Sequence, residues 1–298
     1  MKQVMKVFVA IVTLLVGAVV LRGAGHSYTG PDNGEWETAS NWSNQAVPNL
    51  QSADTYTIGN GRTVVYTPLG VPPAVRPKAL DWATNTTVTI TGQGSSWIQG
   101  GGDRSWIKIG DGAGKTGTLN VADGASWSSG TSNTLVVFLG AAGANGFVTV
   151  GPGSRLTTEG TLRLMNNSIF RSSGTVSASN VSLQGAGSIT LSGGVLSSTI
   201  LSFDGPATST GLVTLSGGHL TLSTVNHGGI FGGGATQYIN FTPGSNSELR
   251  FSNIADAETN ITTGKIRFSG STVPGDGSVF TVSHPTKTAT TIRLRESR

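Results

Sequence analysis

The sequence predicts an all-β protein that folds as a single parallel β-helix, because three kinds of landmark recur together along the middle of the chain. Each recurrence lies 28 to 30 residues after the last, and a period in this range indicates a solenoid, a propeller or an array. The landmarks are turn glycines (Gly94, Gly124 and Gly153), large residues that follow them (Trp97, Trp127 and Leu156) and closing glycines (Gly117, Gly146 and Gly174).

Each repeat offers two strands of about four or five residues, which are too short to enclose a hydrophobic core alone. We therefore expect each strand to pair with its counterpart one repeat further on. This pairing places Val121 beside Val150, and Trp127 between Trp97 and Leu156. A propeller blade would need about four strands in 40 to 50 residues, and helical repeats would need a sustained apolar period of about 3.6 residues. A sandwich of antiparallel hairpins is the remaining alternative.

Residues 1–25 read as a secretory signal peptide. Lys2 and Lys6 supply the positive end, Val7 to Leu21 the apolar stretch, and Gly23 to Gly25 the small residues that a signal peptidase requires. The apolar run is about 15 residues long, short of the ~20 that span a bilayer, so cleavage is favoured over a permanent membrane anchor. We expect a secreted or cell-surface protein with no membrane span after removal of the signal.

Charge and cysteine content narrow the possible partners. The full chain has 19 Lys+Arg against 15 Asp+Glu, and loss of Lys2, Lys6 and Arg22 with the signal leaves a net charge of about +1. A balance this close to zero does not favour a nucleic-acid partner. The chain has no cysteine, so it must be stable without disulfides. We expect no cofactor.

Residues 26–79 differ from the repeats and are expected to form an N-terminal capping segment, because they show no repeat landmark. A solenoid needs a cap where its terminal turn exposes an unpaired sheet edge and an uncovered core. The repeats are expected to fill residues 80–270, where the run Leu191–Leu196 recurs 24 residues later as Leu215–Leu220. Residues 271–298 are expected to form the closing strands.

A motif of spaced residues lies within this capping segment. Its residues are Trp36, Asn41, Trp42, Pro48, Asp54, Ile58 and Gly61. Together with the glycine-rich repeats after it, the motif resembles the head of bacterial exported β-helix proteins, which include autotransporter-passenger-like and PEP-CTERM-type surface proteins. The resemblance covers roughly residues 33–200.

This resemblance implies a right-handed, pectin-lyase-like β-helix outside the cell, usually without an assigned activity. The general preference for right-handed crossovers favours the same hand. The chain departs from these families after Asn260, where neither a membrane barrel nor a Pro-Glu-Pro segment with an apolar helix is visible. The resemblance therefore predicts architecture and leaves the means of surface attachment open.

The acidic residues do not form a catalytic pattern. Asp81, Asp103 and Asp111 could approach one another across neighbouring coils, and glycoside hydrolysis needs two carboxyls about 5 to 10 Å apart. The Asn-x-Asp, Asp-Asp, Gly-His-Gly and Arg-x-Lys motifs of polygalacturonase-like enzymes are absent, however. Acids such as Asp123 and Asp204 stand singly beside glycine, where Asp is favoured as a turn residue. We expect no catalytic residues among them.

Two other kinds of site and one further function are not supported. The four histidines lack the spacing of metal ligands, so we expect no metal site. The glycine-rich run Gly110–Gly117 lacks the spacing of a phosphate loop and precedes a strand rather than a helix. The threonine-rich run Thr86–Thr91 suggests an ice-binding lattice, but the variable repeat length and mixed residue types argue against that function.

The tryptophans give the candidate ligand site. Trp97 and Trp127 occupy equivalent repeat positions and are expected inside the coil, where they would stack in a ladder. Trp106 lies outside that ladder, and an exposed indole can stack on a sugar. Trp106 with the neighbouring Asp103 and Arg104 is therefore the candidate ligand-binding set.

These observations predict a non-enzymatic exported β-solenoid that acts as a cell-surface, matrix or adhesion component and binds polysaccharide or neighbouring proteins. The alternative is a carbohydrate-active enzyme, a polysaccharide lyase or hydrolase on the same fold. A groove that gathered two or more carboxylates with an Arg or Lys within about 6 Å would favour the enzyme. The oligomeric state is left open.

Overall fold

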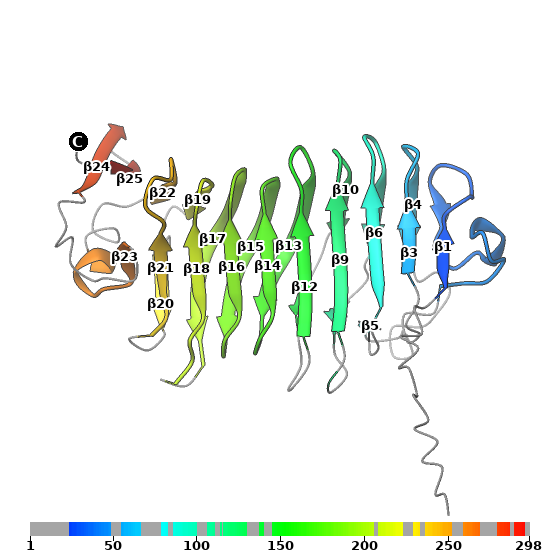
Figure 1. Cartoon of the computed structure of the whole chain (residues 1–298), viewed down its shortest axis with the longest axis horizontal. Coiled ribbons are helices and arrows are strands. Elements are labelled where there is room, and N and C mark those ends of the chain that lie inside the picture. The colour runs from blue at the N-terminus through cyan, green and yellow to red at the C-terminus, as the bar shows by residue number, and fades with distance from the viewer. Residues whose placement is uncertain are drawn as a thin grey trace, which may run out of the picture.

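The computed structural model is an elongated stack of strands (Figure 1). It describes residues 24–48, 55–66, 79–82, 86–99, 106–110, 114, 116–129, 137–139, 145–205, 208–222, 229–232, 236–251, 259–268, 279–286 and 289–295. The predicted signal peptide lies almost wholly outside these residues. Helix in the described part is confined to the 3-10 helix η1 (Ala39–Asn41) and a helical turn at 259–262. The prediction of an all-β protein is confirmed.

The strands form two sheets that run along the stack. The ten-stranded sheet has the order β1 (Gly25–Ser27), β3 (Thr55–Ile58), β6 (Thr87–Thr91), β9 (Thr116–Ala122), β12 (Asn145–Val150), β14 (Ile169–Ser172), β16 (Ser188–Leu191), β18 (Leu212–Leu215), β21 (Tyr238–Phe241) and β23 (Ile266–Phe268).

The fifteen-stranded sheet lies behind the first in Figure 1. Its main path is β2 (Gly34–Glu35), β4 (Thr63–Tyr66), β7 (Ser96–Gln99), β10 (Ser126–Ser129), β13 (Arg155–Leu164), β15 (Thr175–Gln184), β17 (Val195–Asp204), β19 (His219–Leu222), β22 (Glu248–Phe251), β25 (Ala289–Arg295) and β24 (Val279–Thr286), and its side branches are β5 (Ala79–Trp82), β8 (Trp106–Ile109), β11 (Val137–Leu139) and β20 (Gly229–Gly232).

Strands that are neighbours in a sheet come from successive coils of the chain. Val121 on β9 pairs with Val150 on β12, in parallel. Trp127 on β10 pairs with Trp97 on one side and Leu156 on the other, also in parallel. Among the described strands, pairing is parallel everywhere except at the C-terminal hairpin. The predicted parallel β-helix is therefore confirmed, and the antiparallel sandwich is excluded.

The long strand β13 pairs with two separate strands of the preceding coil. Its first half pairs with β10 and its second half with β11. Its register with β15 shifts between Thr158 and Thr161. Small buried residues stack next to this irregularity, where Thr158 pairs with Ala178 and Ala178 with Ser198.

The core consists of apolar ladders, because alternate residues of each strand point inward and equivalent positions stack at about 4.8 Å. The inward positions of β9, β12 and β14, for example, are buried, whereas the residues between them are partly or fully exposed. Trp97 and Trp127 are 0% and 1% exposed. The prediction that these two tryptophans lie inside the coil is confirmed.

The landmark glycines occupy turns that require a left-handed backbone. Gly94, Gly124 and Gly153 have φ values of +79°, +79° and +70°, a region that costs other L-residues about 1–2 kcal/mol. A buried serine after such turns links one coil to the next. The amide of Gly61 donates to Ser95 Oγ at 3.0 Å, and the amide of Gly124 donates to Ser154 Oγ at 3.1 Å.

Parallel pairing is already present within residues 26–79, the expected N-terminal capping segment. β3 pairs with β6 from Thr55↔Thr87 onward, and β4 pairs with β7 from Thr63↔Ser96 onward. β1 in turn pairs with β3. Strands β1 to β4 therefore already belong to the two sheets.

Aromatic residues close the N-terminal end of the core. Trp42 packs edge-on against Trp36, with ring centroids 4.8 Å apart, and its Nε1 donates to the Trp36 carbonyl at 2.9 Å. The side chain of Asn41 donates to the Glu35 carbonyl at 3.0 Å. A Cβ at Gly30 would lie 2.5 Å from the Asn41 side chain, so the turn accepts only glycine there. The Trp-Asn-Trp part of the motif therefore folds the chain over the end of the core.

The C-terminal end is closed by a hairpin of β24 and β25. β25 runs antiparallel to β22, the last parallel strand of its sheet. β24 lies at the edge of the sheet and contains Pro285, which has no amide N–H, beside a break in the register after Ser283. Proline and irregular pairing both discourage further strands from adding to an edge.

Candidate functional site

The candidate ligand-binding set is only partly within the described residues. Trp106 begins β8, where it is in register with Ala79 of β5. Its side chain, together with Asp103 and Arg104, lies outside what the structure describes. The proposed contribution of these three residues to ligand binding stays a prediction.

Two carboxylates that were expected in turns each accept a hydrogen bond from the preceding coil. Asp123 lies in the turn after β9, with φ +55°, and accepts a hydrogen bond from Thr91 Oγ1 at 2.7 Å. Asp204 ends β17 and accepts a hydrogen bond from Ser182 Oγ in the preceding coil. The expected turn position of Asp123 is confirmed.

The Asp32 side chain holds the turn before β2 in place by a hydrogen bond to Thr63. Its Oδ1 accepts the backbone amide of Thr63 at 2.7 Å. Hydrogen bonds from the Thr63 backbone and side chain hold the pKa of the Asp32 carboxyl below its ordinary value. This carboxylate joins the turn between β1 and β2 to β4 of the next coil.

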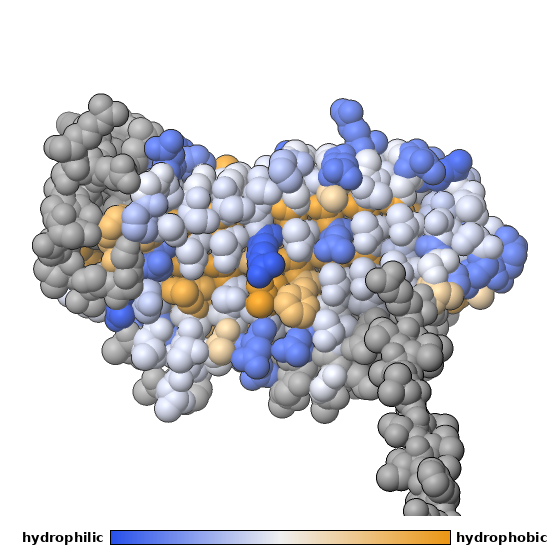
Figure 2. All heavy atoms as spheres, viewed as in Figure 1, coloured by the Kyte–Doolittle hydropathy of each residue, from blue (hydrophilic) through white to orange (hydrophobic). Residues whose placement is uncertain are grey.

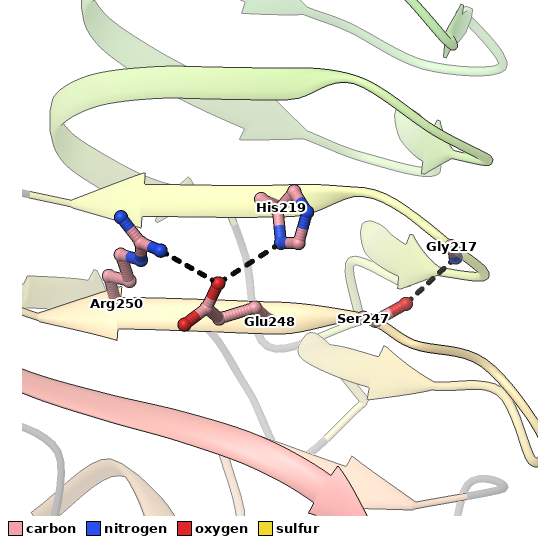
Figure 3. Close-up of polar contacts among 5 residues, drawn as sticks. All are labelled: Gly217, His219, Ser247, Glu248 and Arg250. Atoms are coloured by element: carbon pink, nitrogen blue, oxygen red, sulfur yellow. Dashed lines mark hydrogen bonds and ion pairs between the residues drawn. The ribbon is translucent and has the colours of Figure 1, made fainter. Parts of the chain in front are cut away.

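A charged cluster lies near the C-terminal end, on β19 and β22 (Figure 3). The side chain of Glu248 is 4% exposed although it stands on the outer side of its strand. Its Oε2 lies 2.9 Å from Arg250 Nη2 and 3.3 Å from His219 Nδ1, whose side chains are 53% and 41% exposed. His219 and Glu248 are register partners, and Arg293 of β25 is the partner of Glu248 on its other side.

The residues of this cluster are suited to holding two strands together and not to hydrolysis. It presents one carboxylate between two basic side chains, whereas glycoside hydrolysis uses a pair of carboxyls. In the described part of the chain, no three His, Asp or Glu side chains come together as a metal site. The cluster joins β19 to β22, the strand with which β25 of the hairpin pairs.

The most extensive array of similar groups is the outer surface of the ten-stranded sheet, which we name the polar face. The view in Figure 2 is toward this face, which is mainly pale with smaller blue and orange patches. Side chains that point outward from its strands form two rows across the sheet. Row 1 contains Thr55, Thr87, Thr118, Phe147, Ile169, Ser188, Leu212 and Tyr238, and row 2 contains Ser27, Thr57, Thr89, Asn120, Thr149, Arg171, Thr190, Thr214, Asn240 and Arg267.

The polar face offers regularly spaced hydrogen-bonding groups. Row 2 is made almost entirely of hydroxyl and amide side chains, partly or fully exposed, at the strand spacing of about 4.8 Å. Neighbours within the row can bond to one another, as Asn120 Nδ2 does to Thr89 Oγ1 at 3.4 Å. Such groups both donate and accept hydrogen bonds, so the face suits a long polar ligand better than a small apolar one.

The sequence carries a signal for this face. Thr-x-Thr occurs at Thr55–Thr57 and Thr87–Thr89, and alternation of small polar with apolar residues continues in the later strands. Within one run such as Thr86–Thr91, this pattern predicts only a row of threonines. The register between strands decides which residues of different strands become neighbours in a row, and that register depends on the coil lengths.

No protein-family model matches the chain, and neither a curated protein nor a solved structure does so. None of the helices in the described ranges is long and apolar enough to cross a bilayer.

Proposed function

We propose that the protein is an exported, non-enzymatic β-solenoid that acts as a cell-surface, matrix or adhesion component, and that it binds polysaccharide or neighbouring proteins through the polar face. One observation carries the proposal: row 2 crosses all ten strands with short polar side chains and few charges. A repeated ligand can meet the same kind of group at every strand. The leader-like N-terminus and the resemblance to autotransporter-passenger-like and PEP-CTERM-type proteins support an extracellular location.

The enzyme alternative is not favoured by any observation on the described residues. The carboxylates of Asp32, Asp123, Asp204 and Glu248 each hold a neighbouring segment of the fold. A catalytic acid or base must instead be within reach of the bond that is broken.

Retention of the purified chain on immobilised polysaccharides and on intact cells tests the proposal. The informative variant replaces Thr89, Thr190 and Thr214 by Val, which removes three hydroxyls of row 2 and keeps the β-branched shape. The control replaces Thr157 and Thr221 by Val, because both point outward from the other sheet. We expect retention of wild type and of the control, and severalfold weaker retention of the row 2 variant.

Equal retention of both variants would exclude the polar face as the binding surface. Release of unsaturated or reducing-end products from the polysaccharide would instead favour the enzyme. Absence of retention on every polysaccharide and cell surface would reject the binding function itself.

A further inference from the structure

Charge is distributed unevenly between the two sheets. None of the ten strands of the polar face contains Asp or Glu, and Arg171 on β14 and Arg267 on β23 are its only Lys or Arg residues. The other sheet carries acidic and basic residues together, including Glu159 and Arg163 within β13. The strands of the polar face therefore carry formal charge of one sign only, although the chain without its leader is nearly neutral.

The two arginines stand in the same row. Arg171 pairs with Thr190, Thr190 with Thr214, Thr214 with Asn240, and Asn240 with Arg267. Four strand spacings separate the two arginines along the axis of the solenoid, or about 19 Å. The positions between them hold two hydroxyls and one amide.

The two guanidinium groups are presented differently. Arg171 is exposed, and none of the described carboxylates lies within ion-pair distance of it. Arg267 lies over the ring of Tyr238, with its Cζ 4.0 Å from the ring centroid, and its Nε donates to the Gly264 carbonyl at 3.0 Å. Stacking and this hydrogen bond hold the Arg267 guanidinium in one orientation, which lowers the entropic cost of binding an anion.

Row 1 runs alongside and is more apolar over the same strands. Ile169, Leu212 and Tyr238 are partly exposed there, with Ser188 between the first two. A sugar ring has apolar C–H surfaces and polar edges, so it can lie on row 1 while its substituents reach row 2. Aromatic and aliphatic platforms with a few placed polar groups are typical of binding sites.

On this basis, and resting on the proposed function, we propose that the stretch of polar face from Arg171 to Arg267 binds a linear anionic polysaccharide. The polysaccharide chain runs across the strands, along the axis of the solenoid. Carboxylate or sulfate groups of separate sugar residues bind the two arginines, and ring surfaces lie on row 1. Arginine is suited to this role because its planar fork can donate two parallel hydrogen bonds to a carboxylate or sulfate.

The spacing of the charges favours a polysaccharide over a nucleic acid. Nucleic-acid binding rests on many phosphate contacts, about 6 to 10 in well-studied cases. Two arginines about 19 Å apart fit a polymer with sparse or singly charged units. Duplex DNA serves as the competing polyanion in the test.

Binding of polygalacturonate, heparin and the neutral polymer dextran by the purified full chain tests this proposal. The variants are Arg171→Gln and Arg267→Gln, alone and combined, with Arg155→Gln as the control on the exposed end of β13 in the other sheet. We expect binding of one or both anionic polymers that weakens with salt, and a loss of about fivefold for each arginine of the polar face. Arg155→Gln should bind as wild type does. Polygalacturonate and heparin distinguish carboxylate from sulfate as the preferred group.

Several results would overturn the proposal. Equal binding of dextran and the anionic polymers, insensitive to both arginine substitutions, would overturn it while leaving the proposed function intact. An equal loss of binding in Arg155→Gln would also overturn it. Binding of duplex DNA would overturn it too, if it were as tight as that of the glycans and equally weakened by the Arg171 and Arg267 substitutions. Failure to bind any polysaccharide or cell surface would reject the proposed function as well.

Discussion

The indole rings of Trp36 and Trp97 stack with centroids 4.7 Å apart and an interplanar angle of 11°. Trp36 belongs to the N-terminal motif, and Trp97 is the first tryptophan of the repeat ladder. The motif and the first recognised repeat therefore share one core, and the residues that close the end are also part of the stack.

Substitution of Trp97 by Ala should destabilise the protein strongly, because the side chain is fully buried. We expect a loss of about 3–5 kcal/mol of unfolding free energy for the coils around it, and a coupling with Trp36→Ala of about 0.5–1.5 kcal/mol. Urea unfolding followed by far-UV circular dichroism of the two single variants and the double variant measures both. Ile98→Ala on the same strand is the control, because Ile98 is exposed. Equal effects at the two positions would contradict the buried ladder.

Two turn glycines with similar backbone angles should respond differently to Ala. At Gly194 (φ +64°) an added Cβ would lie 1.9 Å from the Gly174 carbonyl oxygen, whereas at Gly153 (φ +70°) the nearest atom would be 3.9 Å away. We expect Gly153→Ala to cost about 1–2 kcal/mol from backbone strain alone, and Gly194→Ala to cost clearly more. Thermal unfolding midpoints compare the two. Similar midpoints would mean that successive turns are less closely packed than these contacts indicate.

The contribution of Asp32 should depend on pH. Its folded-state pKa is below the unfolded value of about 3.9, so its contact with Thr63 stabilises the fold above that value and is lost as the pH falls through the folded pKa. We expect Asp32→Ala to unfold at lower urea than wild type at pH 6, with the difference vanishing in strong acid. Glu37→Ala, an exposed acid of the same segment, is the control. A difference that stays constant down to strong acid would contradict the role of the carboxylate.

Glu248 should control the attachment of the C-terminal hairpin. Glu248→Ala removes the carboxylate that accepts from Arg250 and faces His219, on the strand next to β25, and we expect local opening to become easier by about 1–3 kcal/mol. Hydrogen exchange of the β25 amides measures this opening. Thr221→Ala, which also points outward near the cluster, should leave it unchanged. Unaltered exchange in Glu248→Ala would show that backbone pairing alone holds the hairpin.

The sequence alone was sufficient for the architecture of the middle of the chain. Gly94, Gly124 and Gly153 revealed the period because each must adopt a left-handed backbone, which few other residues do at low cost. The period then fixed the partners of Val121 and Trp127, since parallel stacking pairs equivalent positions. The motif Leu191–Leu196 likewise predicted its pairing with Leu215–Leu220.

The beginning of the stack and the binding face were harder to predict. Gly61 also has a left-handed backbone and precedes β4, which pairs with Ser96 and Trp97 of β7. Its coil, however, is longer than the coils from which the period was recognised. Hydrogen bonds between coils join residues 33 apart at Ser96 and Thr63, and only 20 apart at Ser188 and Ser168. Local pattern shows which residues point outward, whereas these unequal coil lengths decide which outward residues become neighbours. Arg171 and Arg267 therefore share a row that no fixed period would have found.

The unequal coil lengths also bear on how such a molecule can change. Added or deleted residues are absorbed in the turns, at the rim of the stack, while the sheet keeps its constant pitch. Evolution can therefore vary the rim freely without disturbing the spacing that a long ligand would meet. Duplication or loss of a whole coil would instead lengthen or shorten that surface by one pitch, so its length is adjustable in equal steps.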